Sequence, residues 1–203
     1  MIHGRKLAMS HSKSGVREML SDLEPEGIRP ISATELASMV EAGILRSGEP
    51  VELLRGVLVT MTPPNPPHAE CVDRLTEALV PLLVGRARVR IQGPFAASEH
   101  SVPEPDVGVY PAGDYGRAHP NQALLLIEVS DSSLRKDRRV KGGIYAESGV
   151  PEYWIVNLQD RLVEVLREPV DGVYTHSETA GPGDALSPSA FPDLELRVDA
   201  ILP

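Results

Sequence analysis

The chain has 203 residues, of which 41% are hydrophobic and 4% aromatic, and its formal net charge is −9. This length suits one domain with a substantial core, and no apolar run is long enough to predict a transmembrane helix. The single cysteine, Cys71, excludes an internal disulfide framework and favours a cytoplasmic setting. The acidic balance argues against a protein that coats nucleic acid non-specifically, because such binding depends on clustered lysine and arginine, but it leaves room for a local basic patch or a metal-binding group of acids.

Residues 1–29 are polar and lack strong periodicity, so we expect a mobile extension with a short helix in "GVREMLSDL". The domain is expected over residues 30–203. Its first helix is predicted in "ISATELASMVEAG", with Thr34 in the first turn and Gly43 as the stop. The segment "PVELLRGVLVTM" predicts a hairpin of two apolar strands that turns at Arg55-Gly56.

A second helix is predicted after "TPPNPP", where Asn65 is a candidate N-cap and Pro66 suits the first helical position. Gly85 is expected to end it. Alternation in "RARVRIQ" then predicts a half-buried strand with its arginines on one face. The predicted helix that begins after Asn65 should bury an apolar face made of Val72, Leu75, Leu79 and Leu82.

The middle of the chain predicts a strand, helix and strand in close succession. The segment "QALLLIEVS" is a continuous apolar strand, a helix is expected from Leu134 to Ser148, and "EYWIVN" is another buried strand. These two strands should be parallel, with a right-handed crossover. A hairpin around Asp171-Gly172 and a last strand in "DLELRVDAIL" complete one mixed α/β (α+β) domain.

Two acids stand out in these strands. Glu128 lies inside the apolar run "LLLIEV", and a buried, unpaired carboxylate must pair, shift its pKa or bind a metal. Asp106 lies in the short strand segment "EPDVGVY", which could neighbour the first. Two carboxylates at the ends of adjacent strands make an oxygen-rich site that suits Mg²⁺ or Mn²⁺.

The helix after Glu128 adds a stripe of Asp137, Lys141 and Tyr145 at i, i+4 and i+8. Lys141 is about two turns into the helix, roughly 10 Å of return travel, which brings it back towards Glu128. Lys136 competes for this role, but at 100° per residue it would lie about 140° around the helix from Lys141.

The dipeptide Pro105-Asp106, Glu128 in an apolar strand and a following lysine together resemble the PD-(D/E)XK nuclease superfamily. The run "IEVSDSS…D…K…Y…GVPEYWIVN" is similar to one branch, the Uma-family restriction endonucleases, and the resemblance extends from about Ile31 to about Leu202. The superfamily's lysine usually stands two residues after the acid, where this chain has Ser130. In this branch it is displaced onto the helix, where Lys141 matches it.

The resemblance implies a restriction-endonuclease-like core, a mixed central sheet flanked by helices with antiparallel hairpins. It implies that Asp106 and Glu128 bind Mg²⁺ (or Mn²⁺) and that Lys141 assists the attacking water. The implied activity is metal-dependent endonuclease hydrolysis of phosphodiester bonds, in DNA. The alternative is a catalytically weak or inactive nuclease-fold module for nucleic-acid or protein binding, which the serine at position 130 favours.

Other residues have two interpretations each. Glu52 is a third acid near the metal or a polar residue on the wet face of a hairpin, and His68 is a site residue or a neutral structural histidine whose protonated form the helix N-terminus disfavours. Asp137 orients Lys141 or is exposed, and Tyr145 is an auxiliary or a core aromatic. A candidate nucleic-acid-binding cluster consists of Arg135, Arg138 and Arg139, which are otherwise solvated charge.

The pair Gly142-Gly143 is unfavourable inside a helix by about 1 kcal/mol each, so we expect close packing there, from this chain or from a second subunit. A homodimer would also suit an enzyme that cuts both strands of a duplex.

Overall fold

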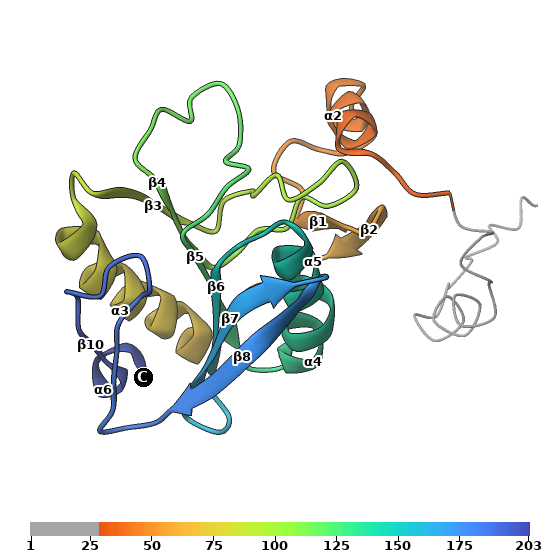
Figure 1. Cartoon of the computed structure of the whole chain (residues 1–203). Helices are drawn as coiled ribbons and strands as arrows, with labels where there is room; N and C mark the ends of the chain where they lie inside the picture. Colours follow the sequence, from red (N-terminus) through yellow and green to blue (C-terminus); the bar gives the residue numbers. More distant parts are fainter. Residues whose placement is uncertain (1–28) are drawn as a thin grey trace, which may run out of the picture. The chain divides into compact units, whose positions relative to one another are not determined.

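The computed structural model describes residues 29–203 (Figure 1). The predictions for residues 1–28, including the helix in "GVREMLSDL", lie outside the described residues. Residues Ile31–Pro203 form one compact unit. None of the helices within the described range is long and apolar enough to cross a membrane.

A mixed sheet is the centre of this unit, and over residues 29–203 it has six strands in the order β3-β4-β5-β6-β7-β8. The central strands β5 and β6 run parallel, whereas the other neighbouring pairs are antiparallel. The predicted strand–helix–strand unit with parallel strands is confirmed. The strands are β3 (Ala87–Ile91), β4 (Val107–Pro111), β5 (Leu125–Ser130), β6 (Glu152–Asn157), β7 (Leu162–Val170) and β8 (Val173–Ala180).

Helices cover both faces of the sheet (Figure 1). On one face lie α3 (Pro66–Leu83) and α6 (Val198–Ile201), and on the other lie α4 (Leu134–Lys136), the π-helical turn η2 (Asp137–Lys141) and α5 (Gly142–Glu147). Alternation along β5 divides its buried side chains between two apolar clusters, one against α3 and one against α5. The predicted α/β architecture with a mixed central sheet is confirmed.

The helix α3 begins as its sequence predicts. The side chain of Asn65 accepts a hydrogen bond from the His68 amide, and proline occupies the first helical position. The prediction of Leu82 as a core residue is wrong, because it is 41% exposed and Leu83 is buried instead. A spacing of four residues from Leu79, rather than three, carries the apolar face to that position.

Smaller elements pack around the sheet. The predicted hairpin is confirmed as β1 (Val51–Leu54) and β2 (Val57–Thr60), and the hairpin of β7 and β8 also forms as expected. The helix α2 (Ala33–Glu41) also forms, with a capping box between Ser32 and Glu35. After β8 in the sequence, β9 (Ala185–Leu186) and β10 (Leu196–Arg197) form a short antiparallel pair of strands.

The prediction of a continuous last strand over Asp193–Leu202 is wrong, because within it only Leu196–Arg197 form a strand, β10, and the chain then folds as α6. Val198, Ile201 and Leu202 are buried, and α6 packs against α3. Their spacing of three and four residues places them on one face of a helix, which an alternating strand would split between two faces.

The predicted helix over Leu134–Ser148 forms, but it contains the π turn η2. The amide of Gly142 donates to the carbonyl of Asp137, five residues earlier. A Cβ on Gly142 would lie 3.3 Å from that carbonyl and 3.6 Å from the Tyr153 ring, and one on Gly143 would lie 3.1 Å from the Arg55 guanidinium. The close packing expected at these glycines therefore comes from within the chain.

Candidate active site

A cleft of about 590 Å³ opens where β5 ends, between the β1–β2 hairpin, the start of α3 and the helix η2. Its lining combines side chains from segments far apart in the sequence. Those that carry charge or can gain it include Glu52, His68, Glu104, Asp106, Glu128 and Lys141.

The sheet brings Asp106 and Glu128 to neighbouring positions. Asp106 directly precedes β4, rather than lying within it, and Val107 pairs with Ile127 on β5. The carboxylate of Asp106 accepts a hydrogen bond of 2.8 Å on Oδ2 from the amide of Val129, the residue after Glu128. Both acids line the cleft, so the adjacency inferred from the strands is present.

Lys141 reaches the same point from η2. Its Nζ lies 2.9 Å from Oε1 of Glu128 and 2.7 Å from Oε1 of Glu52, and these three side chains are at most 4% exposed. The hydroxyl of Tyr145 donates to the same Glu128 oxygen at 2.6 Å. Tyr145 is thus both a core aromatic and a direct partner of Glu128.

These contacts set the charge of the lysine. Burial alone would lower the pKa of Lys141, but the carboxylates of Glu128 and Glu52 outweigh it and raise this pKa. Lys141 is therefore a cation at every physiological pH. Burial raises the pKa of Glu128 well above its usual value, although the ammonium opposes that effect.

Glu52 lies inside the cleft and is not a residue on the wet face of its hairpin. It is 1% exposed, and its Oε1 also accepts a hydrogen bond of 2.9 Å from the amide of Glu104. Burial raises the pKa of Glu52, but Lys141, this amide and Lys136 together bring it below its ordinary value. Glu52 is thus a charged partner of Lys141.

His68 lies beside Asp106, with Nε2 3.2 Å from Oδ2 of the carboxylate. This hydrogen bond raises the pKa of His68, against the burial that would lower it. The expectation that the helix N-terminus keeps this histidine neutral is wrong in direction, because the hydrogen bond and the charge of Asp106 favour the protonated ring. In return, burial raises the pKa of Asp106, but His68 and the Val129 amide outweigh it, and this pKa is lowered.

Asp137 neither contacts Lys141 nor faces solvent. It is 1% exposed and accepts hydrogen bonds from the hydroxyls of Ser130, at 2.6 Å, and Ser133. Its backbone carbonyl accepts a further bond from the Tyr153 hydroxyl at 3.2 Å. Asp137 therefore joins the start of η2 to the end of β5, and the hydroxyl of Ser130 is one of the donors that hold it there.

The candidate nucleic-acid-binding arginines lie outside the cleft lining. Arg138 makes a two-pronged ion pair with Glu164 on β7, at 2.8 and 2.6 Å, and Arg135 and Arg139 are exposed. Lys136, in contrast, lines the cleft and lies 3.4 Å from Oε2 of Glu52.

The prediction that Lys136 points away from Lys141 is wrong, because a π turn brings residues five apart to the same side of the helix. Sequence reasoning also missed Glu104, which lines the cleft. It stands two residues before Asp106, and this proximity is the signal that could have drawn attention to it.

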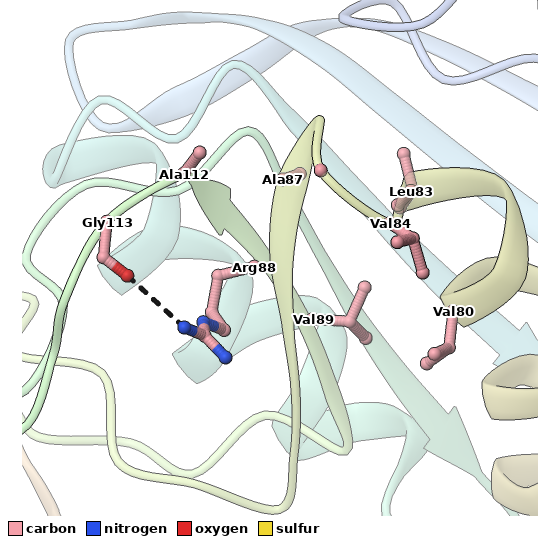
Figure 2. A pocket seen from close by; sticks show the side chains of 9 residues that line it. Val80, Leu83, Val84, Ala87, Arg88, Val89, Ala112 and Gly113 are labelled. Carbon is pink, nitrogen blue, oxygen red and sulfur yellow. Dashed lines mark hydrogen bonds between the residues drawn. The ribbon is translucent and has the colours of Figure 1, made fainter.

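A second hollow, of about 360 Å³, lies between the end of α3 and the strand β3 (Figure 2). Its lining is apolar apart from Arg88, which lies beside the carbonyl of Gly113. The neighbouring Arg86 is held by two hydrogen bonds of 2.8 Å to Asp193. This hollow contains none of the acidic residues of the cleft.

Comparisons with known proteins agree with this architecture. A crystal structure of a "putative nuclease belonging to DUF820" from Anabaena variabilis ATCC 29413 matches with a TM-score of 0.63 and 17% identity, covering 85% of this chain and 97% of that chain. No curated protein gives a match. The sequence model of the family Uma2, described as "Putative restriction endonuclease", matches residues 36–199. The chain therefore belongs to the Uma2 family.

Proposed function

We propose that this protein is a metal-dependent endonuclease that hydrolyses phosphodiester bonds in DNA. The observation that carries the proposal is the meeting of Asp106, Glu128 and Lys141 in one cleft, with Glu52 completing the charge network. The family description and the nuclease named as a structural neighbour support hydrolysis of nucleic acid as the chemistry.

The donor atoms of the two acids fit a hard divalent cation. Hydrogen bonds occupy Oδ2 of Asp106 and Oε1 of Glu128, and within residues 29–203 the other oxygen of each carboxylate has no hydrogen-bond partner. In the described part of the chain, no three His, Cys, Asp or Glu side chains gather into a complete metal cage. Mg²⁺ does not need one, since it commonly takes one or two carboxylates and completes its shell with water and phosphate.

The charge of the cleft supports the same assignment. Of its described lining residues six are acidic and two are lysines, so the empty cleft would repel a phosphate backbone. A divalent cation would offset part of this negative charge at the point where the phosphate binds, and it would supply Lewis acidity for the phosphodiester and the attacking water.

The residues of the chain would hold the reacting groups in place. Tyr145 and Lys141 fix one oxygen of Glu128, and His68 and the Val129 amide fix one oxygen of Asp106. Because Lys141 is a permanent cation, its role is to stabilise the negative charge that develops on the phosphoryl group, and it does not remove a proton from water.

The test is nicking of supercoiled plasmid DNA with Mg²⁺ or Mn²⁺ and with EDTA. Glu128→Gln and Asp106→Asn should lower the rate by about 100-fold or more, the scale of losing an electrostatic stabiliser. Glu164→Gln is the matched control, because this nearly buried acid binds Arg138 outside the cleft and should leave the rate unchanged. Cleavage that survives in EDTA or in Glu128→Gln would reject the proposal.

One observation favours an alternative, a nuclease-fold module that binds without cutting. Ser130 stands where the wider superfamily usually has its lysine, and its hydroxyl is used by Asp137. Calorimetric binding of Mn²⁺ that disappears in Glu128→Gln, together with DNA binding but no cleavage, would support this module over the enzyme.

A further inference from the structure

We propose that Lys136 is a substrate-binding residue that contacts a phosphate of the DNA backbone, whereas Lys141 stays behind it as the fixed cation of the site. This inference rests on the proposed function and names the group of the cleft that meets the substrate.

The π turn brings Lys136 and Lys141 to the same side of the helix. In a regular α-helix residues 136 and 141 would point about 140° apart, but the π turn between them places both on the cleft side. Each lysine reaches one oxygen of Glu52: Lys141 lies 2.7 Å from Oε1 and Lys136 lies 3.4 Å from Oε2.

The two lysines differ in their exposure to solvent. The side chain of Lys141 is 4% exposed and is held by Glu128, Glu52 and the carbonyl of Glu104. The side chain of Lys136 is 33% exposed, and its contact with Glu52 is long for a charge-assisted hydrogen bond. An ammonium that is held loosely and reaches solvent can turn to a phosphate without breaking the buried network.

The charge pairs around Glu52 do not depend on Lys136 alone. Lys141 and the amide of Glu104 already satisfy Oε1 of Glu52, so this acid keeps strong partners when Lys136 moves. The three arginines of this helix do not line the cleft, and Arg138 is engaged by Glu164. Among the described lining residues, Lys136 is thus the lysine available to a ligand.

The test measures the binding of a short fluorescent DNA duplex by anisotropy over a range of salt concentrations, with Ca²⁺ in place of Mg²⁺. Each lysine–phosphate contact contributes about 0.9 to the slope of log K against log salt. Lys136→Ala should reduce that slope by about one and weaken binding to different sequences equally. Lys136→Arg, which keeps the charge, should restore most of the slope.

Arg197→Ala is the control, because Arg197 is an exposed cation on β10 that does not line the cleft and belongs to no candidate nucleic-acid-binding cluster. It should leave the slope close to that of the wild type. In cleavage assays Lys136→Ala should raise KM and change kcat little, whereas a residue that only neutralises Glu52 would alter stability and leave KM and the slope unchanged.

The outcomes separate this inference from the proposed function. A wild-type protein that binds and cuts DNA, with an unchanged slope in Lys136→Ala, overturns the inference alone. A wild-type protein that neither binds nor cuts DNA overturns both. Equal thermal midpoints of the wild type and Lys136→Ala show that a change in slope is not a loss of fold.

Discussion

The ammonium of Lys141 lies 2.9 Å from the carboxylate of Glu128, 13 residues away in the sequence, and both side chains are 4% exposed. A lone buried carboxylate would be strongly unfavourable in this sheet. The lysine compensates two such acids at once, because Glu52 lies on its other side at 2.7 Å. One cation therefore links the hairpin, the central sheet and the helix.

Lys141→Met should consequently destabilise the fold. The substitution keeps the length of the side chain but removes the ammonium that contacts Glu128 and leaves Glu52 with the longer contact to Lys136, which costs about 3–5 kcal/mol. Urea denaturation at neutral pH measures this loss. Lys136→Met serves as the control, because its partly exposed contact with Glu52 should contribute no more than about 1 kcal/mol. Equal losses in the two variants would contradict the prediction.

Glu128→Gln should leave the metal-free protein as stable as the wild type or more stable at pH 7. Burial raises the pKa of Glu128 above the 4.5 of an ordinary glutamate, so above pH 4.5 the folded state keeps a proton that the unfolded chain has released. Wild-type stability therefore falls as pH rises through this window, by at most about 1.4 kcal/mol per pH unit, and the amide lacks this dependence.

Denaturation of the two proteins in EDTA across pH 4 to 8 tests this sign. The advantage of the variant should grow as pH rises, and added Mg²⁺ should reverse the order by stabilising the wild type alone. A variant that is clearly less stable than the wild type without metal would instead identify Glu128 as a structural partner of Lys141.

The proximity of Asp106 and Glu128 could be predicted from the sequence, because the position of each acid follows from a local strand pattern and from the pairing of neighbouring strands. An acid inside a continuous apolar strand indicates a compensated carboxylate, and a return helix of known rise brings Lys141 back to it. The catalytic and metal-binding roles of these residues remain predictions.

The position of Lys136 could not be obtained in this way. Periodicity assumes 100° per residue, whereas η2 departs from it, and we attribute this departure to the hydrogen bonds that join Asp137 to Ser130 on β5 and Tyr153 on β6. These contacts are tertiary, so nothing in the local sequence specifies the π turn. The helix α6 was missed for a similar reason, since packing against α3 selects helix over strand for an apolar segment.

Asp137→Ala tests the anchor of the π turn. It removes the acceptor of the hydroxyls of Ser130 and Ser133 and should cost about 1–3 kcal/mol, because the Ser130 hydroxyl is then buried without a partner. If this anchor positions the lysines, plasmid nicking should fall further than the loss of folded protein explains. Ser133→Ala removes one of the two bonds and should have a smaller effect on both measurements. Normal nicking by folded Asp137→Ala would show that the turn holds without its anchor.

Gly108 on β4 leaves space for the side chain of Tyr110 to lie across the sheet. A Cβ at position 108 would lie 2.2 Å from the Tyr110 hydroxyl oxygen and 2.4 Å from the ring carbon that bears it, and Tyr110 is fully buried. Gly108→Ala should therefore destabilise the protein by about 3 kcal/mol or more, since the ring cannot move without disturbing the core. In Gly113→Ala the added Cβ has no contact closer than 3.7 Å, so that control should be nearly neutral.

A double-mutant cycle with Tyr110→Leu identifies the cause of this loss. The shorter side chain does not extend across position 108, so Gly108→Ala should cost less in that background, with a coupling energy of about 0.5–3 kcal/mol. Urea denaturation of the four proteins measures this coupling. Additive losses would mean that position 108 requires glycine for its backbone conformation, and that the contact with the Tyr110 side chain is not the reason for the loss.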